Sequence, residues 1–94
     1  MVVAEIRVLN ASKADFDAFD VGVSGAIEEM GGPPEGLVTH VVRPDGDGFV
    51  ICDVWRTPED LRRFNDGVLL PMLAAAGHVV SDERVSPVWS YARP

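Results

Sequence analysis

The chain has 94 residues, of which 47% are hydrophobic and 24% charged, and its formal net charge at pH 7 is −7. This length is that of one domain, residues 1–94. The eight basic residues are scattered, so no basic stripe is available for nucleic acid or for an anionic membrane, and both are excluded as expected partners.

A single cysteine, Cys52, excludes an internal disulfide and is compatible with a reducing compartment. The first residues contain neither a basic segment nor a long apolar one. The sequence therefore predicts no signal peptide and no membrane span, and we expect a cytoplasmic protein.

The N-terminal third predicts a strand followed by a helix. Residues 1–9 are mostly apolar and β-branched, which is typical of a strand. Ser12 stands three residues before Asp15, as in a capping box, and marks a helix start. The predicted buried stripe of this helix is Phe16, Phe19, Val23, Ile27 and Met30. The Gly-Gly-Pro-Pro run at 31–34 ends the helix.

The remainder predicts a hairpin, a second helix and a last strand. Residues 37–43 and 49–56 are the hairpin strands, joined by a turn within 44–48. Thr57 and Pro58 begin a helix that ends at Gly77. Its predicted buried stripe is Leu61, Phe64, Val68, Met72 and Ala75. Pro71 clashes with the carbonyl of Gly67, so we expect a kink or a break there.

The last strand is expected over residues 83–93, with Pro87 favouring an edge position. The order β-α-β-β-α-β is the ferredoxin-like α+β pattern, an antiparallel sheet with both helices on one face. Residues 37–42 and 49–52 do not alternate between apolar and polar, which indicates burial on both faces of the sheet. A second copy of the chain is the simplest cover for the free face, so we expect a C₂ homodimer.

His40 is the most informative polar residue, because a side chain of this kind in a valine-rich strand must be satisfied. If Gly46 and Asp47 form a two-residue turn, Asp45 pairs with Gly48 and His40 lies opposite Asp53. Such a pair could act as a general acid or base near neutral pH. The register shifted by one residue would place His40 opposite Cys52 instead. A structural histidine bonded to the backbone is the alternative interpretation, as is an Asp53 paired with Arg7 or Arg93.

Aromatic and apolar residues near this pair are the candidates for substrate contact. Phe49, Ile51 and Trp55 share the face of Asp53, and Trp55 could instead simply pack on the second helix. Trp89 and Tyr91 share one face of the last expected strand, where they could line a pocket or, more in keeping with an edge strand, an interface. Glu5 and Arg7 are expected to form an ion pair. No His or Cys cluster has metal-ligand spacing, so no metal is predicted.

The segments 36–42, 47–49, 53–61, 63–64 and 70–73 resemble the dimeric α/β-barrel superfamily, and within it the antibiotic-biosynthesis-monooxygenase-like proteins. The resemblance covers residues 36–77 and implies two sheets packed face to face, with a small pocket between sheet and helices in each subunit. Members include cofactor-free oxygenases, haem-degrading enzymes, polyketide cyclases and isomerases.

Departures from these relatives are as informative as the matches. The quinone oxygenases carry an Asn four residues before the strand tryptophan and a Tyr six residues after it, where this chain has Ile51 and Leu61. Only Trp55 matches. Haem-degrading members carry a Trp and a His on the second helix, where this chain has Phe64 and apolar residues.

The leading hypothesis is a small-molecule enzyme that needs no cofactor and acts on a flat, apolar, polyketide-like compound. It would be a cyclase, an isomerase or a monooxygenase in which His40 moves the proton, Asp53 orients His40, and Trp55 and Phe64 wall the pocket. The alternative is a non-catalytic ligand-binding or structural homodimer. Haem binding ranks below both.

Overall fold

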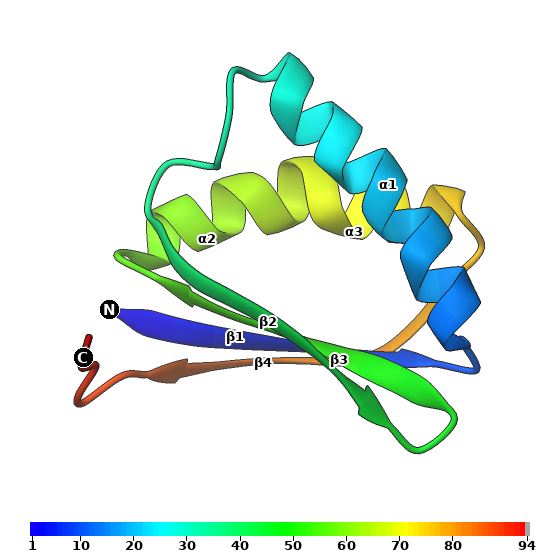
Figure 1. Cartoon of the computed structure of the whole chain (residues 1–94). Helices are drawn as coiled ribbons and strands as arrows, with labels where there is room; N and C mark the ends of the chain where they lie inside the picture. Colours follow the sequence, from blue (N-terminus) through cyan, green and yellow to red (C-terminus); the bar gives the residue numbers. More distant parts are fainter. Residues whose placement is uncertain (94) are drawn as a thin grey trace.

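The computed structural model describes residues 1–93 and contains the predicted order of elements. In chain order these are β1 (Val2–Leu9), α1 (Lys13–Glu29), β2 (Leu37–Asp45), β3 (Gly48–Trp55), α2 (Pro58–Phe64), the π-helical turn η1 (Asn65–Leu69), α3 (Leu70–Ala75) and β4 (Val79–Pro87). The strands form one antiparallel sheet in the order β2-β3-β1-β4. Both helical segments cover the same face of this sheet (Figure 1). The ferredoxin-like α+β fold is confirmed.

The β2–β3 hairpin has the register that the two-residue turn predicts. Asp45 pairs with Gly48, and Gly46 has a positive φ of 57°. Gly48 is also required by close packing, because a Cβ atom there would lie 1.9 Å from the carbonyl oxygen of Val8. The turn and the neighbouring end of β1 therefore fix each other, and with them the alignment of β2 on β3.

The helix starts are the predicted ones. Ser12 and Asp15 form a complete capping box, with the Ser12 hydroxyl accepting from the backbone N–H of Asp15 at 3.1 Å. Thr57 caps α2 through the N–H of Asp60, also at 3.1 Å. Each helix is thus anchored at the end that leaves the sheet.

The kink expected between Gly67 and Pro71 is a π-helical turn, in which the N–H of Leu70 donates to the carbonyl of Asn65. A π-turn holds one extra residue, so it rotates the following helix by one position. The predicted stripe is therefore wrong after Phe64. Leu69 and Leu73 are buried, in place of Val68 and Met72, and Ala75 is exposed.

The last strand lies earlier than predicted, at Val79–Pro87 rather than 83–93. Its partner is β1, and Pro87 pairs with Val2 at the very start of that strand. One more hydrogen bond follows, from the N–H of Val88 to the carbonyl of Met1. Beyond that point β1 offers no residue to pair with, so Trp89 and Tyr91 lie outside the sheet, and Trp89 is 97% exposed. The strand is an edge strand, as expected.

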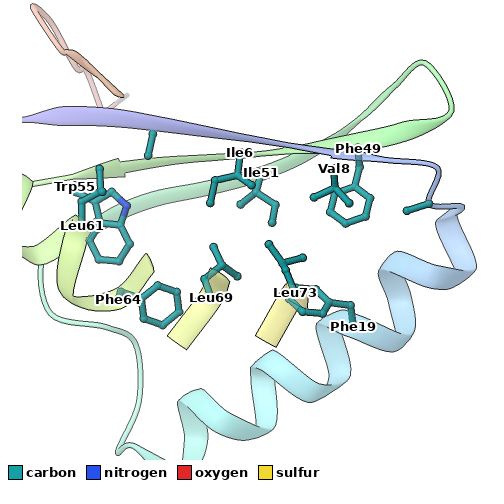
Figure 2. Close-up of a cluster of buried hydrophobic side chains, with 12 residues drawn as sticks. Ile6, Val8, Phe19, Phe49, Ile51, Trp55, Leu61, Phe64, Leu69 and Leu73 are labelled. Carbon is teal, nitrogen blue, oxygen red and sulfur yellow. The ribbon is translucent and has the colours of Figure 1, made fainter. Parts of the chain in front are cut away.

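The core lies between the sheet and the helices (Figure 2). Ala4, Ile6 and Val8 of β1 and Phe49, Ile51 and Trp55 of β3 supply its sheet side. Leu61, Phe64, Leu69 and Leu73 supply its helix side, together with Phe19 of α1. Met30, the last position of the predicted α1 stripe, is 54% exposed and stands outside this core.

The opposite face of the sheet, called here the outer face, mixes apolar and charged side chains. Its members from β1, β2 and β3 include Val3, Glu5, Arg7, Val41, Cys52 and Val54. Arg7 forms its ion pair with Asp45 rather than with Glu5, so that prediction is wrong. Val41 is 52% exposed. Among residues 1–93, no helix is long and apolar enough to cross a membrane.

Candidate functional site

The centre of the site is a pair of side chains from adjacent strands. His40 of β2 lies opposite Asp53 of β3, and the distance from His40 Nδ1 to Asp53 Oδ1 is 2.5 Å. The predicted register is therefore correct, and Asp53 is paired with His40 rather than with an arginine. The Asp53 side chain is only 5% exposed, whereas that of His40 is 49% exposed. The pair reaches from the core to the surface.

This arrangement fixes what the imidazole can do. A carboxylate at Nδ1 accepts the proton of that nitrogen, which leaves Nε2 as the atom that exchanges a proton with a ligand. The hydrogen bond and the charge of Asp53 raise the pKa of His40 from its usual 6.5, partly opposed by burial, and the charge of Asp20 acts in the same direction as Asp53. His40 is thus a stronger base than a free histidine.

His40 and Asp53 line a cavity of 270 Å³ between the sheet and the helices. The apolar lining from α1 consists of Phe16, Phe19, Val23 and Ile27. That from the sheet consists of Leu37, Val42, Ile51 and Trp55. Phe64 and Leu69, the residues that flank and end the π-turn, complete it with the two prolines of the 31–36 loop. The volume lies just below the usual range of ligand pockets, which favours a compact ligand.

Trp55 contributes a wall of the cavity. The residue is fully buried and its indole Nε1 has no hydrogen-bond partner among residues 1–93. Its ring stacks at a tilt of 37° on Phe64, with centroids 5.6 Å apart. Figure 2 shows the indole nitrogen turned toward the interior between sheet and helices. A buried N–H without a partner is costly, and this one has no surface exposed to a ligand in the cavity, so Trp55 contributes an apolar wall to the site.

The structure brings together some predicted site residues and separates others. His40, Asp53, Trp55, Phe64 and Ile51 share the cavity. Phe49 packs in the core against Phe16 and His78 instead. Trp89 and Tyr91 follow β4 and are absent from the lining that the described residues form.

Sequence reasoning missed two polar residues of the lining, Asp20 and Ser24 of α1. They stand four residues after Phe16 and Asp20 respectively, directly beside the apolar stripe. This i, i+4 spacing places them on the cavity side of the helix, and it could have identified them.

Other reactive groups lie elsewhere. Cys52 points to the outer face, and burial raises the pKa of its thiol, which disfavours a nucleophilic role. His78 packs edge-on against Phe19 at 5.6 Å between ring centroids. Among residues 1–93, no group of three or more His, Cys, Asp or Glu side chains is arranged to hold a metal ion.

No protein-family model matches the sequence, and no curated protein matches it either. Solved structures do match. A Deinococcus radiodurans protein, provisionally assigned as an antibiotic biosynthesis monooxygenase, is 13% identical, with a TM-score of 0.66 over 100% of this chain and 98% of that one. A variant of SnoaB, a cofactor-independent oxygenase from Streptomyces nogalater, is 14% identical, with a TM-score of 0.65 over 96% and 93% of the two chains.

Rv0793 from Mycobacterium tuberculosis is 15% identical, with a TM-score of 0.62 over 99% and 100% of the two chains. Identities this low establish a shared fold. The resemblance to the antibiotic-biosynthesis-monooxygenase-like proteins is therefore confirmed at the level of the fold.

Proposed function

We propose that the protein is a small-molecule enzyme in which His40 transfers a proton to or from a flat, largely apolar, polyketide-like compound, without a bound cofactor. The observation that carries this proposal is the His40–Asp53 pair in the wall of an apolar cavity. The shared fold with a cofactor-independent oxygenase supports it. His40 is proposed to move the proton and Asp53 to orient His40. Trp55 and Phe64 are proposed to form walls of the pocket.

The first step would be the same for a cyclase, an isomerase or a monooxygenase. Neutral His40 accepts a proton at Nε2 from an acidic C–H beside a ligand carbonyl, and the electron pair of that bond moves to the carbonyl oxygen as an enolate. Asp53 stabilises the imidazolium that forms.

Proton abstraction can be tested before the natural substrate is known. The probe is 2-tetralone, a compact bicyclic ketone with an acidic C–H, and the readout is exchange of that hydrogen for deuterium in D₂O, followed by NMR. The wild-type protein is expected to accelerate exchange, and His40→Gln is expected to lose about 10²-fold or more of that acceleration. His78→Gln is the matched control, because this histidine packs on Phe19 and Phe49.

The second candidate is a ligand-binding protein without turnover. The buried apolar residues Ile51 and Leu61, 3% and 1% exposed, favour it because they stand where polar residues are expected in the quinone oxygenases. Under this alternative the ketone would bind, as calorimetry would detect, but exchange would not exceed that of the His40→Gln variant. That result would refute the catalytic proposal.

The proposal includes a homodimer formed through the outer face, within the cytoplasm. Val3, Val41 and Val54 supply apolar area there, and Glu5, Arg7 and Arg84 supply charges of both signs for contacts with a second copy. Val41→Asp places a charge in that surface and is expected to weaken association at least tenfold, measured by native mass spectrometry over a dilution series. Val21→Asp, on an exposed position of α1, is the control. A monomeric wild-type protein at high concentration would refute the dimer.

A further inference from the structure

The cavity has a one-sided charge distribution. The polar lining that residues 1–93 form consists of Asp20, Ser24, His40 and Asp53, and it contains no Lys or Arg. Within the described part of the chain, His40 is the only lining group that can carry positive charge, and its Nδ1 lies 2.5 Å from Asp53 Oδ1. A protonated pair is therefore neutral overall, whereas a deprotonated pair is negative. Asp20 adds a further negative charge in either state.

Asp20 lines the cavity from α1. It is exposed, while its neighbours on α1 toward the cavity, Phe19 and Val23, are buried or half-buried. The aromatic body of a flat ligand would rest among the apolar residues, and a substituent at the mouth would meet Asp20. Asp20 forms no ion pair with residues 1–93, unlike Asp17, which binds Lys13 at 2.6 Å. Its charge is thus available to a ligand.

We infer that the site selects flat ligands that are neutral or carry an amine at the mouth of the cavity, that it rejects carboxylated ones, and that Asp20 is the residue that determines this specificity. This inference rests on the proposed function, because it assumes that the cavity receives the substrate. Attraction toward an ammonium group and repulsion of a carboxylate come from the same charge, so one substitution should remove both.

The experiment compares three naphthalene derivatives of one shape by titration calorimetry at low salt: 2-naphthylmethylamine as the ammonium, 2-naphthylmethanol as the neutral compound, and 2-naphthoate as the anion. The expected order of affinity is ammonium, then alcohol, then carboxylate. The ammonium should bind about tenfold more tightly than the carboxylate. Raising the ionic strength to 1 M should reduce that ratio, because the carboxylate of Asp20 is exposed to salt.

Two variants remove one negative charge each from the same helix. Asp20→Asn should bring the ammonium-to-carboxylate ratio down to about threefold or less, because it removes the charge and keeps the size of the side chain. Asp17→Asn, the matched control, should preserve the wild-type ratio. Equal effects of the two variants would mean that only net charge matters, and this result would overturn the inference.

The remaining outcomes separate the inference from the proposed function. Equal affinity of the wild-type protein for all three compounds overturns the selectivity and leaves the ligand cavity in place. Binding of none of them overturns the inference, and if 2-tetralone exchange is also absent, the proposed function fails with it. Exchange of 2-tetralone without charge selectivity overturns the inference alone.

Discussion

Asp82 and Glu83 are neighbours on β4, yet they lie on opposite faces of the sheet and have different kinds of partner. Asp82 faces outward and pairs with Arg84 on its own strand at 2.9 Å, where the Arg84 side chain is 73% exposed. Glu83 faces the helices, where Arg62 donates to it at 2.5 Å and the buried amide of Asn65 at 3.2 Å. The carboxylate on the outer face thus forms a contact that is exposed to solvent. The carboxylate on the helix-facing side joins the sheet to the π-turn.

The two faces differ in the same way at most positions, although Val50 on the outer face is also buried. On the helix-facing side the apolar residues of β1 and β3 are packed to near-zero exposure, and the acidic groups Asp53 and Glu83 have specific partners. On the outer face, valines alternate with charges that pair locally. The helix-facing side therefore determines stability and holds the site, while the outer face is free to meet another surface.

The largest effect is expected from a cavity on the helix-facing side. Ile6→Ala should lower the free energy of unfolding by about 2–5 kcal/mol, because Ile6 is 1% exposed and the space it leaves cannot be filled by solvent. Val41→Ala, at a residue 52% exposed on the outer face, should cost well under about 1 kcal/mol in dilute solution. Urea denaturation at two protein concentrations measures both. A large cost for Val41→Ala at high concentration only would indicate burial by a partner.

The next effect compares the two acids of β4. Glu83→Ala should destabilise the fold by about 1–3 kcal/mol, because it leaves the Asn65 amide buried without its acceptor. Asp82→Ala should change stability by less than about 0.5 kcal/mol, since its partner is exposed. Thermal unfolding followed by circular dichroism ranks them. Equal costs would mean that the Glu83 contacts contribute no more than a surface pair.

The smallest effect is a shift in titration. Asp53 raises the pKa of His40, so protonation of His40 stabilises the folded state; this stability is fully present below the pKa of the unfolded chain and is lost as pH rises through the higher folded value. Asp53→Asn should lower the pKa of His40 toward 6.5, which NMR titration of the ring measures. The pH at which 2-tetralone exchange reaches half its maximum should fall with it. An unchanged midpoint would contradict the role of Asp53.

The sequence was sufficient for the element order and for the central pair of the site, and both follow from local rules. A two-residue turn at Gly46 and Asp47 implies a register in which His40 lies opposite Asp53, and the structure has this register rather than the one shifted by one residue. Capping residues likewise fix where helices begin. These features depend mainly on residues that are close together in the sequence.

Features that depend on distant partners were missed. Trp89 and Tyr91 alternate as a strand would, but β4 ends because β1 has no earlier residue to pair with it. The buried positions after Phe64 were misplaced because helical periodicity assumes an uninterrupted α-helix. Asp20 was missed although its i, i+4 spacing from Phe16 places it beside the stripe, because the cavity that gives this position a role exists only in the folded chain.

The π-turn has a consequence for how this chain is aligned with others. Because Asn65–Leu69 holds one residue more than an α-helical turn, the buried positions Leu61, Phe64, Leu69 and Leu73 would have regular helical spacing in a chain one residue shorter. Deleting Gly67 would leave these four side chains facing the sheet. If this chain is aligned without a gap to a chain whose helix has no π-turn, the core positions of that helix fall on Val68 and Met72. Every later position of the alignment is then shifted by one residue.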